Sequence, residues 1–253
     1  MLRRRIIPFL LIDKNYDCIK TTNFSSRKYI GDILNNIRIF NEKNVDEIVV
    51  LDIDASSNSY EPRFDLIKDI ASVCRMPVTY GGGVKDLKMS KKIISSGVEK
   101  ICLNSAIISN FDLIKEISQE IGSQSLSVSI NFKKIDGKYY FVENNGKKIQ
   151  KNIIDFISEI QKYGAGEIVF NSYNDDGNMS GYDLNFLDNI LNYVSVPSVI
   201  VGGCSDYEDI KNLFLKHKNI AAGCSSIFIF KGKLKAVLIS YPSERERLNI
   251  SES

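Results

Sequence analysis

Two glycine-rich turns hold the residues of this sequence whose type and spacing best suit chemistry. The apolar run 76–79 leads through Tyr80 into glycines 81–83, and the run 196–201 leads into Gly202 and Gly203. Glycine at a strand-to-helix turn lets backbone N–H groups approach an anion closely, and the positive end of the helix dipole favours phosphate there. Gly82 and Gly203 stand 121 positions apart. This spacing predicts a duplicated scaffold that grips a substrate with two phosphates; two tight turns without a ligand are the alternative.

Composition narrows the classes of protein that fit. The chain has 253 residues, 33 basic and 31 acidic, and a net charge of +2, so we expect neither nucleic acid nor a membrane surface as partner. No apolar stretch reaches transmembrane length. Its five cysteines lack metal or disulfide spacing, which is typical of a reduced, cytoplasmic protein. The single histidine, His217, argues against histidine catalysis. We therefore expect no metal and no cofactor.

The order of apolar runs predicts the fold. Short β-rich runs alternate with amphipathic stretches, which favours a parallel sheet, and a chain of 253 residues suits a closed (β/α)₈ TIM barrel spanning 1–253 as a single domain. A β-hairpin insert is expected near 134–148, around Asp136 and Gly137. The strands are predicted at 5–12, 47–53, 77–81, 100–104, 125–132, 167–172, 198–202 and 221–225, and the helices at 30–43, 64–73, 87–96, 111–121, 153–163, 184–193 and 207–216.

An internal repeat supports the barrel. The triplet 104–106 that ends the fourth strand matches the triplet 225–227 that ends the eighth, again at an offset of 121. A repeat of this length predicts two fused half-barrels. In such barrels the chemistry occurs at the carboxyl ends of the strands, whereas the amino ends usually serve stability.

Several matching stretches make the chain resemble a known family over essentially its whole length. The family is the cyclase subunit of imidazole glycerol phosphate synthase. The resemblance implies a barrel that accepts ammonia from a glutaminase partner and closes an imidazole ring on a substrate phosphorylated at both ends. The stretches that carry it are 5–8, 47–53, 81–83, 104–106, 122–124, 164–168, 176–177, 180–183 and 202–203.

The resemblance also implies substrate-binding residues at the carboxyl ends of the strands. Lys20 matches a lysine that closes over the substrate, and Asp52 and Asp176 match substrate-binding acids. Helix capping is the alternative role for the polar side chains 104, 105, 225 and 226, and both roles are compatible. The implied phosphate sites are Gly82, Gly83, Asn104 and Ser105 in one half, and Gly177, Gly203, Ser225 and Ser226 in the other.

Two positions depart from the family in a way that bears on catalysis. The family uses two aspartates as general acid and base, at the ends of strands one and five. Here Leu11 and Asn131 occupy these positions. Leucine transfers no proton and asparagine does not titrate usefully, so we expect almost no cyclase activity. Asp13 is a possible substitute, although it lies about 6–7 Å further along an extended strand.

The opposite end of the predicted barrel keeps the family pattern. Arg5, Glu47, Lys100 and Glu167 each begin a predicted strand, and the resemblance makes them the gate through which ammonia enters. Solvated charges at strand starts are the alternative, which explains a balanced set of four poorly. Two further positions match the face that docks the glutaminase: Glu99 and Gln124.

Three functions remain open at this stage. The first is a paralogue that forms a heterodimer with a glutaminase and channels ammonia through the barrel, with a sugar amidotransferase as possible further partner in surface-polysaccharide biosynthesis, a pathway that includes lipopolysaccharide. The second is a genuine cyclase of histidine biosynthesis, a lyase. The third is a non-catalytic subunit that activates its glutaminase. All three keep a phosphorylated small molecule as the ligand expected at the mouth.

Overall fold

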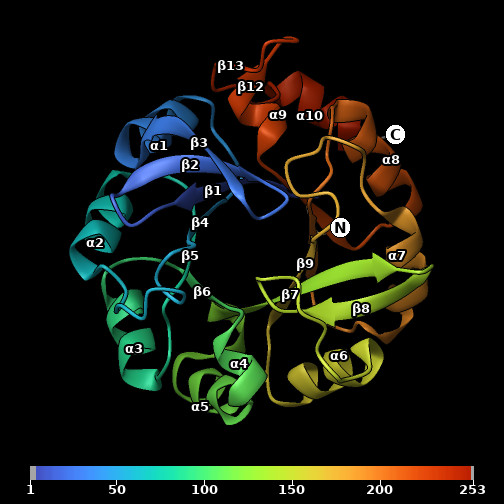
Figure 1. The fold of residues 1–253 in the computed structure, drawn as a ribbon. Helices are drawn as coiled ribbons and strands as arrows, with labels where there is room; N and C mark the ends of the chain where they lie inside the picture. Colours follow the sequence, from blue (N-terminus) through green and yellow to red (C-terminus); the bar gives the residue numbers. More distant parts are fainter. Residues whose placement is uncertain (1–3, 252–253) are drawn as a thin grey trace.

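A closed parallel barrel forms the centre of the molecule, as the sequence predicted (Figure 1). The computed structural model describes residues 4–251. Within that range eight parallel strands follow one another around the barrel, and β11 pairs with β1 to close it. The strands are β1 (Ile6–Ile12), β4 (Ile48–Asp52), β5 (Val78–Gly81), β6 (Lys100–Leu103), β7 (Leu126–Ile135), β9 (Glu167–Ser172), β10 (Ser198–Val201) and β11 (Ile220–Cys224).

An outer ring of helices covers the strands. Each main helix turns an apolar stripe inward, and several begin at an Asp or Asn whose side chain accepts a backbone N–H of the first turn, as Asp86 does from Met89. These caps explain why helices start where the apolar periodicity starts. The helices are α1 (Ile33–Glu42), α2 (Phe64–Val73), α3 (Leu87–Ser95), α5 (Asp112–Ile121), α6 (Ile153–Lys162), α7 (Leu184–Ile190) and α8 (Tyr207–Lys216).

The barrel interior is layered along its axis. Alternate residues of a strand face the interior, so positions 5, 7, 9 and 11 of the first strand and 47, 49 and 51 of the next descend from one end to the other. The amino end is charged. The middle is an apolar layer separate from the main core, and the carboxyl end opens into a cavity. The middle layer is made of Ile7, Phe9, Val49, Cys102, Val169, Val199 and Ala221.

The largest difference from the sequence prediction lies after β1. A helix was predicted from position 30, but residues 17–32 form two antiparallel strands, β2 (Asp17–Thr22) and β3 (Ser26–Asp32). The helix α1 starts only at Ile33, because Asp32 has an extended backbone and its side chain caps Asn35. The chain between β1 and α1 is therefore an ordered hairpin, which we call the lid hairpin (residues 17–32).

A second hairpin follows β7. The strand β8 (Lys138–Val142) pairs antiparallel with the end of β7 across Asp136 and Gly137, both at positive φ. Elements that the sequence pattern missed are short: α4 (Ala106–Ser109), α9 (Ser226–Ile229), β12 (Phe230–Lys231), β13 (Ala236–Val237), α10 (Glu244–Ser251) and the 3₁₀ turns η1 (Ser123–Ser125) and η2 (Leu191–Tyr193). Over residues 4–251 no helix has the length and apolar content to cross a membrane.

Candidate functional site

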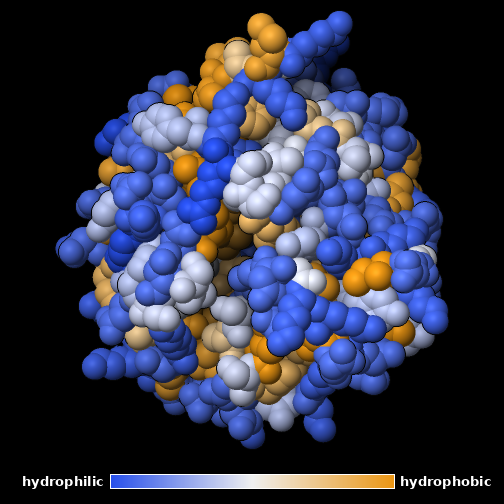
Figure 2. Space-filling model, viewed as in Figure 1, coloured by the Kyte–Doolittle hydropathy of each residue, from blue (hydrophilic) through white to orange (hydrophobic). Residues whose placement is uncertain are grey.

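A cavity of about 670 Å³ opens at the carboxyl ends of the barrel strands. Figure 2 shows the hollow near the centre of this face, between the lid hairpin and the β7–β8 hairpin. Its lower wall is apolar and reaches the middle layer at Phe9, Cys102 and Val169. Within residues 4–251 no group of three or more His, Cys, Asp or Glu side chains is placed to hold a metal ion. Predicted site residues that line the cavity are Leu11, Lys20, Asp52, Gly82, Gly83, Asn104, Ser105, Asn131, Asp176 and Ser225.

The first glycine turn is closely packed against its neighbours. Gly82 has a φ of +120°, and a Cβ there would lie 2.3 Å from the carbonyl oxygen of Asp52. Asn104 donates its amide to the carbonyl of Ser129 at 2.9 Å, while its Oδ1 is buried with no hydrogen-bond partner in the protein. The exposed Ser105 hydroxyl lies near that of Ser56. The turn at Gly82 thus tolerates no side chain, and Asn104 and Ser105, which follow β6, contribute polar side chains to the same cavity wall.

The second glycine turn contributes less to the cavity wall. Ser225 lines the cavity and its buried hydroxyl lacks a hydrogen-bond partner in the protein, but Gly177, Gly203 and Ser226 lie outside the lining. A Cβ on Gly203 would meet the carbonyl oxygen of Gly181 at 2.0 Å, and one on Gly177 would meet the lid hairpin at the carbonyl of residue 21, 2.3 Å away. The two halves of the predicted phosphate site are therefore unequal in the structure.

The two positions that the sequence analysis assigned to an acid and a base hold no carboxylate. Leu11 pairs with Leu51 on the neighbouring strand, which makes this side of the mouth apolar. On the other side, three amides form a chain: Asn171 donates to Oδ1 of Asn131 at 3.1 Å, and Asn131 donates to Oδ1 of Asn144 at 2.7 Å. The sequence did not single out Asn171 or Asn144. The β7–β9 register, which sets Asn131 beside Asn171, is the signal that finds the first of them.

Asp13 takes a structural place in the turn that follows β1. Its Oδ1 accepts the backbone N–H groups of Asn15 at 2.8 Å and of Asp17 at 3.2 Å. This is an Asx-type turn, in which the carboxylate replaces a backbone acceptor. The side chain is not part of the cavity lining, so its geometry gives no support to a role as a substitute acid.

Acidic side chains at the mouth are mostly engaged by cations. Three of them line the cavity among the residues that the structure describes: Asp52, Asp176 and Glu143. Asp52 and Asp176 are ion-paired, whereas Glu143 has only Lys147 nearby, at 4.0 Å on the same exposed loop. The sequence analysis did not single out Glu143.

The lid hairpin is fastened over the second half of the barrel by one carboxylate. Lys20, which is 6% exposed, donates its ammonium to Oδ1 of Asp176 at 3.0 Å. Oδ2 of Asp176 accepts the hydroxyl of Thr21 and the backbone N–H of Phe24. Phe24 in turn stacks on Tyr173 with ring centroids 4.5 Å apart. The lysine and the aspartate that the sequence assigned to the substrate therefore bind each other in this structure.

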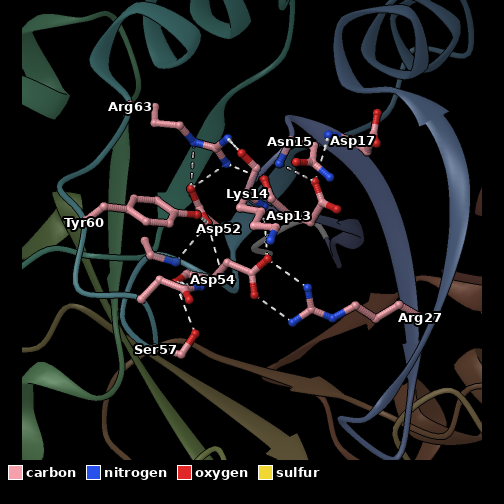
Figure 3. A network of polar contacts seen from close by, with 12 residues as sticks. Asp13, Lys14, Asn15, Asp17, Arg27, Asp52, Asp54, Ser57, Tyr60 and Arg63 are labelled. Atoms are coloured by element: carbon pink, nitrogen blue, oxygen red, sulfur yellow. Dashed lines mark hydrogen bonds and ion pairs between the residues drawn. The ribbon is translucent and has the colours of Figure 1, made fainter.

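A second set of polar contacts lies over the first half of the barrel, and one of them, between Arg27 and Asp54, fastens the lid hairpin there (Figure 3). Arg27 forms a two-pronged ion pair with Asp54, at 2.8 and 2.7 Å, and this hydrogen bonding lowers the pKa of Asp54 below its usual value. Arg63 binds Asp52 at 2.7 Å and also the backbone carbonyl of Asp13. Both arginines were missed by the sequence analysis, because an isolated arginine in a loop carries no pattern.

At the opposite end, the four predicted gate residues form a closed ring. Arg5 binds Glu47 and Glu167, each at 2.6 Å. Lys100 binds the same two carboxylates from the other side, at 3.0 and 3.4 Å. The carboxylates are nearly buried, with 5% and 8% of their side chains exposed, whereas the two cations are 26% and 20% exposed. Every charge in the ring thus has two partners of opposite sign.

Hydroxyl groups complete the ring from inside. Thr79 donates to Glu47 at 3.1 Å and Ser127 donates to Glu167 at 2.8 Å. Burial alone would raise the pKa of Glu167, but the charges of Arg5 and Lys100 outweigh it, so that pKa lies below its usual value of 4.5. Glu167 is therefore ionised at neutral pH.

The two predicted docking residues lie at the same end as the ring. Glu99 and Gln124 are exposed; Glu99 directly precedes β6, and Gln124 lies in η1 just before β7. The Glu99 carboxylate also accepts the backbone N–H of Val78 at 2.7 Å.

Comparisons with known proteins agree with this arrangement. The family model described as "Histidine biosynthesis protein" matches residues 5–235. The chain is 44% identical to a Vibrio vulnificus protein named "Putative imidazole glycerol phosphate synthase subunit hisF3", over 98% of this chain and 96% of the relative. A similarly named Pseudomonas aeruginosa protein is 42% identical over 96% and 97%. A Dictyoglomus thermophilum protein named "Imidazole glycerol phosphate synthase subunit HisF" is 38% identical, over 91% of both chains. The chain therefore belongs to the HisF family of histidine biosynthesis proteins.

Proposed function

We propose that this chain is the synthase subunit of a glutamine amidotransferase complex that passes ammonia through its barrel without closing an imidazole ring. One observation carries the proposal: a complete charged ring at the barrel floor is combined with a mouth whose two acid–base positions are Leu11 and Asn131. We propose a glutaminase as partner on the floor, beside the ring, Glu99 and Gln124, in a heterodimer.

The physics of the floor supports a gate. Gathering four charges in a narrow, half-buried ring is costly unless each is paired, and replacing such a ring with apolar residues often costs nothing in stability. A purely structural floor has no need of it. Above the ring lies the middle apolar layer, whose members include Ile7 and Ala221. Only a neutral molecule crosses such a layer at a small cost in free energy. Ammonia in its neutral form meets this condition, whereas ammonium does not.

The physics of the mouth supports a different acceptor. The amide chain through Asn131 engages hydrogen-bond donors and acceptors but carries no proton that it can lose near neutral pH. General acid–base catalysis contributes about 10² to 10⁴ in rate per group, so a mouth without it suits delivery of a nucleophile better than ring closure. As acceptor we propose a sugar of surface-polysaccharide biosynthesis, converted by a sugar amidotransferase.

The test is a reconstitution of the complex. The purified chain and its glutaminase are mixed, and the stoichiometry is measured by light scattering. Glutamine hydrolysis is then followed with and without candidate sugars and the amidotransferase. The proposal predicts a 1:1 complex with faster hydrolysis when the acceptor and its amidotransferase are present. Absence of any complex, or production of imidazole glycerol phosphate by that complex, would overturn it.

A genuine cyclase is the second candidate, favoured by Glu143, the only cavity-lining carboxylate within residues 4–251 without a close cationic partner. In that case Glu143→Gln abolishes a measurable ring-closing activity. A subunit that only activates its glutaminase is the third candidate. It accelerates glutamine hydrolysis but transfers no nitrogen to any acceptor, so nitrogen transfer separates it from the first.

A further inference from the structure

The segment after α9 forms a small exposed hairpin that takes no part in the barrel. Its strands β12 and β13 pair only with each other, in a sheet separate from the main one within the described residues. Residues 231–238 are all exposed. Leu234 is 93% exposed, Leu238 59% and Val237 43%. Hydrophobic atoms gather over this hairpin at the top of Figure 2. We call residues 230–238 the rim hairpin.

Charge on the rim hairpin has a single sign. Its sequence contains Lys231, Lys233 and Lys235 and no acidic residue. A fourth lysine, Lys28 of the lid hairpin, lies against it: its ammonium is 4.7 Å from the centre of the Phe230 ring and donates to the carbonyl of Lys235 at 2.8 Å. The rim hairpin is thus an apolar tip surrounded by ammonium groups.

Its position ties it to the mouth of the barrel. The rim hairpin begins four residues after Ser226, where α9 starts, and the preceding Ser225 lines the cavity. Its other anchor, Lys28, follows Arg27, which also lines the cavity and pairs with Asp54. A protein docked on the rim hairpin would therefore stand beside the cavity opening, at the end of the barrel opposite to the charged ring.

We propose that the rim hairpin is the docking surface for the protein that carries the ammonia acceptor, and that this protein offers an apolar pocket bordered by acidic side chains. The inference rests on the proposed function, since it needs ammonia to leave the barrel at the mouth. A fully exposed leucine with apolar neighbours fits the apolar centre of an interface, and the lysines fit its polar border. An acidic border on the partner would complement the three lysines.

Two other occupants fit the chemistry less well. A second copy would bring the same patch against itself, so lysines 231, 233 and 235 of one molecule would face those of the other. An anionic membrane attracts proteins through clusters of about four to eight basic residues, whereas this chain has a net charge of only +2 and one lysine here is already held on Phe230. The observations therefore favour a protein partner.

The experiment has two steps and uses the full chain. A photo-reactive phenylalanine analogue replaces Ala236, an exposed residue of the tip, and the protein that cross-links in cells is identified and purified. Its affinity for the wild-type chain is then measured by calorimetry. We expect Leu234→Ser to weaken binding by about tenfold or more, as the loss of a central contact does. Lys233→Glu should also weaken binding, because a glutamate would face the acidic border of the partner. An acidic residue of the partner changed to lysine should restore binding to Lys233→Glu.

The matched controls are substitutions of exposed residues outside the rim hairpin. Leu215→Ser on α8 and Lys138→Glu on β8 should leave the affinity unchanged. Cross-links only between copies of this chain, binding to anionic phosphatidylglycerol vesicles alone, or equal affinity of all variants would each overturn the proposal. Glutamine hydrolysis by the complex with the glutaminase should be the same for every rim variant. If the wild-type chain does not bind the glutaminase, the proposed function is refuted. If the wild type and all rim variants bind the cross-linked partner with equal affinity, only the docking surface is refuted.

Discussion

The two ends of this barrel differ in the side chains that they carry. At the floor, four charges from four strands form a ring in which each charge has two partners. At the mouth, the positions that the family resemblance assigns to an acid and a base hold an apolar side chain and an amide, and Lys20 and Asp176 bind each other. The same strands thus carry a complete ring of ion pairs at one end and a cavity without those two carboxylates at the other.

In the proposed function, this difference separates the transport of ammonia from its reaction. Ion pairs at the floor require accurate placement of four backbone positions, and a buried ion pair adds little stability compared with apolar residues of similar volume. Proton transfer at the mouth requires titratable groups, and an amide cannot replace them. A barrel with the first and without the second is expected to deliver ammonia and to leave its reaction to another site.

A measurement of cyclase activity tests the difference between the two ends of the barrel, and we expect it to give the largest effect. With free ammonium and a bis-phosphorylated substrate, we expect turnover below that of a relative with both carboxylates by a factor of about 10⁴ or more, since each group contributes about 10² to 10⁴. The measurement is the rate of imidazole glycerol phosphate formation. The matched variant Leu11→Asp/Asn131→Asp should raise the rate. Wild-type turnover within about tenfold of an ordinary cyclase would show that the altered mouth still works.

The first glycine turn tests whether the mouth still binds phosphate. In Gly82→Ala the new Cβ would lie 2.3 Å from the carbonyl oxygen of Asp52, so the turn must shift. We expect binding of a bis-phosphorylated ligand to weaken by about tenfold or more, because backbone N–H groups must point at the anion. Gly137→Ala is the matched control: it has a φ of +77° and nothing within 4 Å of a new Cβ. Equal affinities of both variants would argue against a phosphate site at this turn.

Acid should weaken the floor through Glu167. Its pKa is lower in the folded chain than its usual value of 4.5, so the ring stabilises the fold fully above that value and loses its contribution as the pH falls through the lowered pKa. We expect the free energy of unfolding of the wild type to decrease more steeply below pH 4.5 than that of Glu167→Gln. Urea unfolding at a series of pH values gives both curves. Parallel curves would mean that the ring adds nothing to stability.

The lid hairpin should give the smallest effect. Arg27 is 45% exposed, and such ion pairs contribute about 1 kcal/mol or less. Arg27→Ala should therefore speed ligand release by only about two- to fivefold, which stopped-flow fluorescence detects. Arg38→Ala, an exposed arginine on α1, serves as control. A change of several hundredfold would mean that the lid depends on this contact far more than its exposure indicates.

The strands and main helices followed from local patterns in the sequence. Apolar runs and amphipathic stretches place them within a few residues of their observed limits. The floor ring could also be predicted, because each member begins a strand and parallel strands bring their amino ends together. The position of a residue within a strand is thus enough to predict its place when the strand belongs to the barrel.

Site residues in loops could not be predicted from the sequence, for a physical reason. Arg27, Arg63 and Asn144 reach the mouth from segments whose course depends on tertiary contacts. The lid hairpin was mistaken in part for the start of a helix, because the apolar residues 30, 33 and 37 continue the helical spacing across the cap at Asp32. Such errors arise where two elements of different kind share one apolar pattern.

The source of the transferred nitrogen tests the central claim most directly. The complete system of this chain, its glutaminase and the acceptor enzyme is given glutamine labelled with ¹⁵N in the side-chain amide, together with excess unlabelled ammonium. If ammonia travels through the barrel, the aminated product of the wild type carries ¹⁵N despite the excess. Lys100→Ala, which leaves Glu47 and Glu167 to share Arg5, should lose most of that label while the protein stays folded. A wild-type product labelled only in proportion to the ammonium in solution, or unchanged labelling in Lys100→Ala, would contradict the account and leave the ring a structural feature.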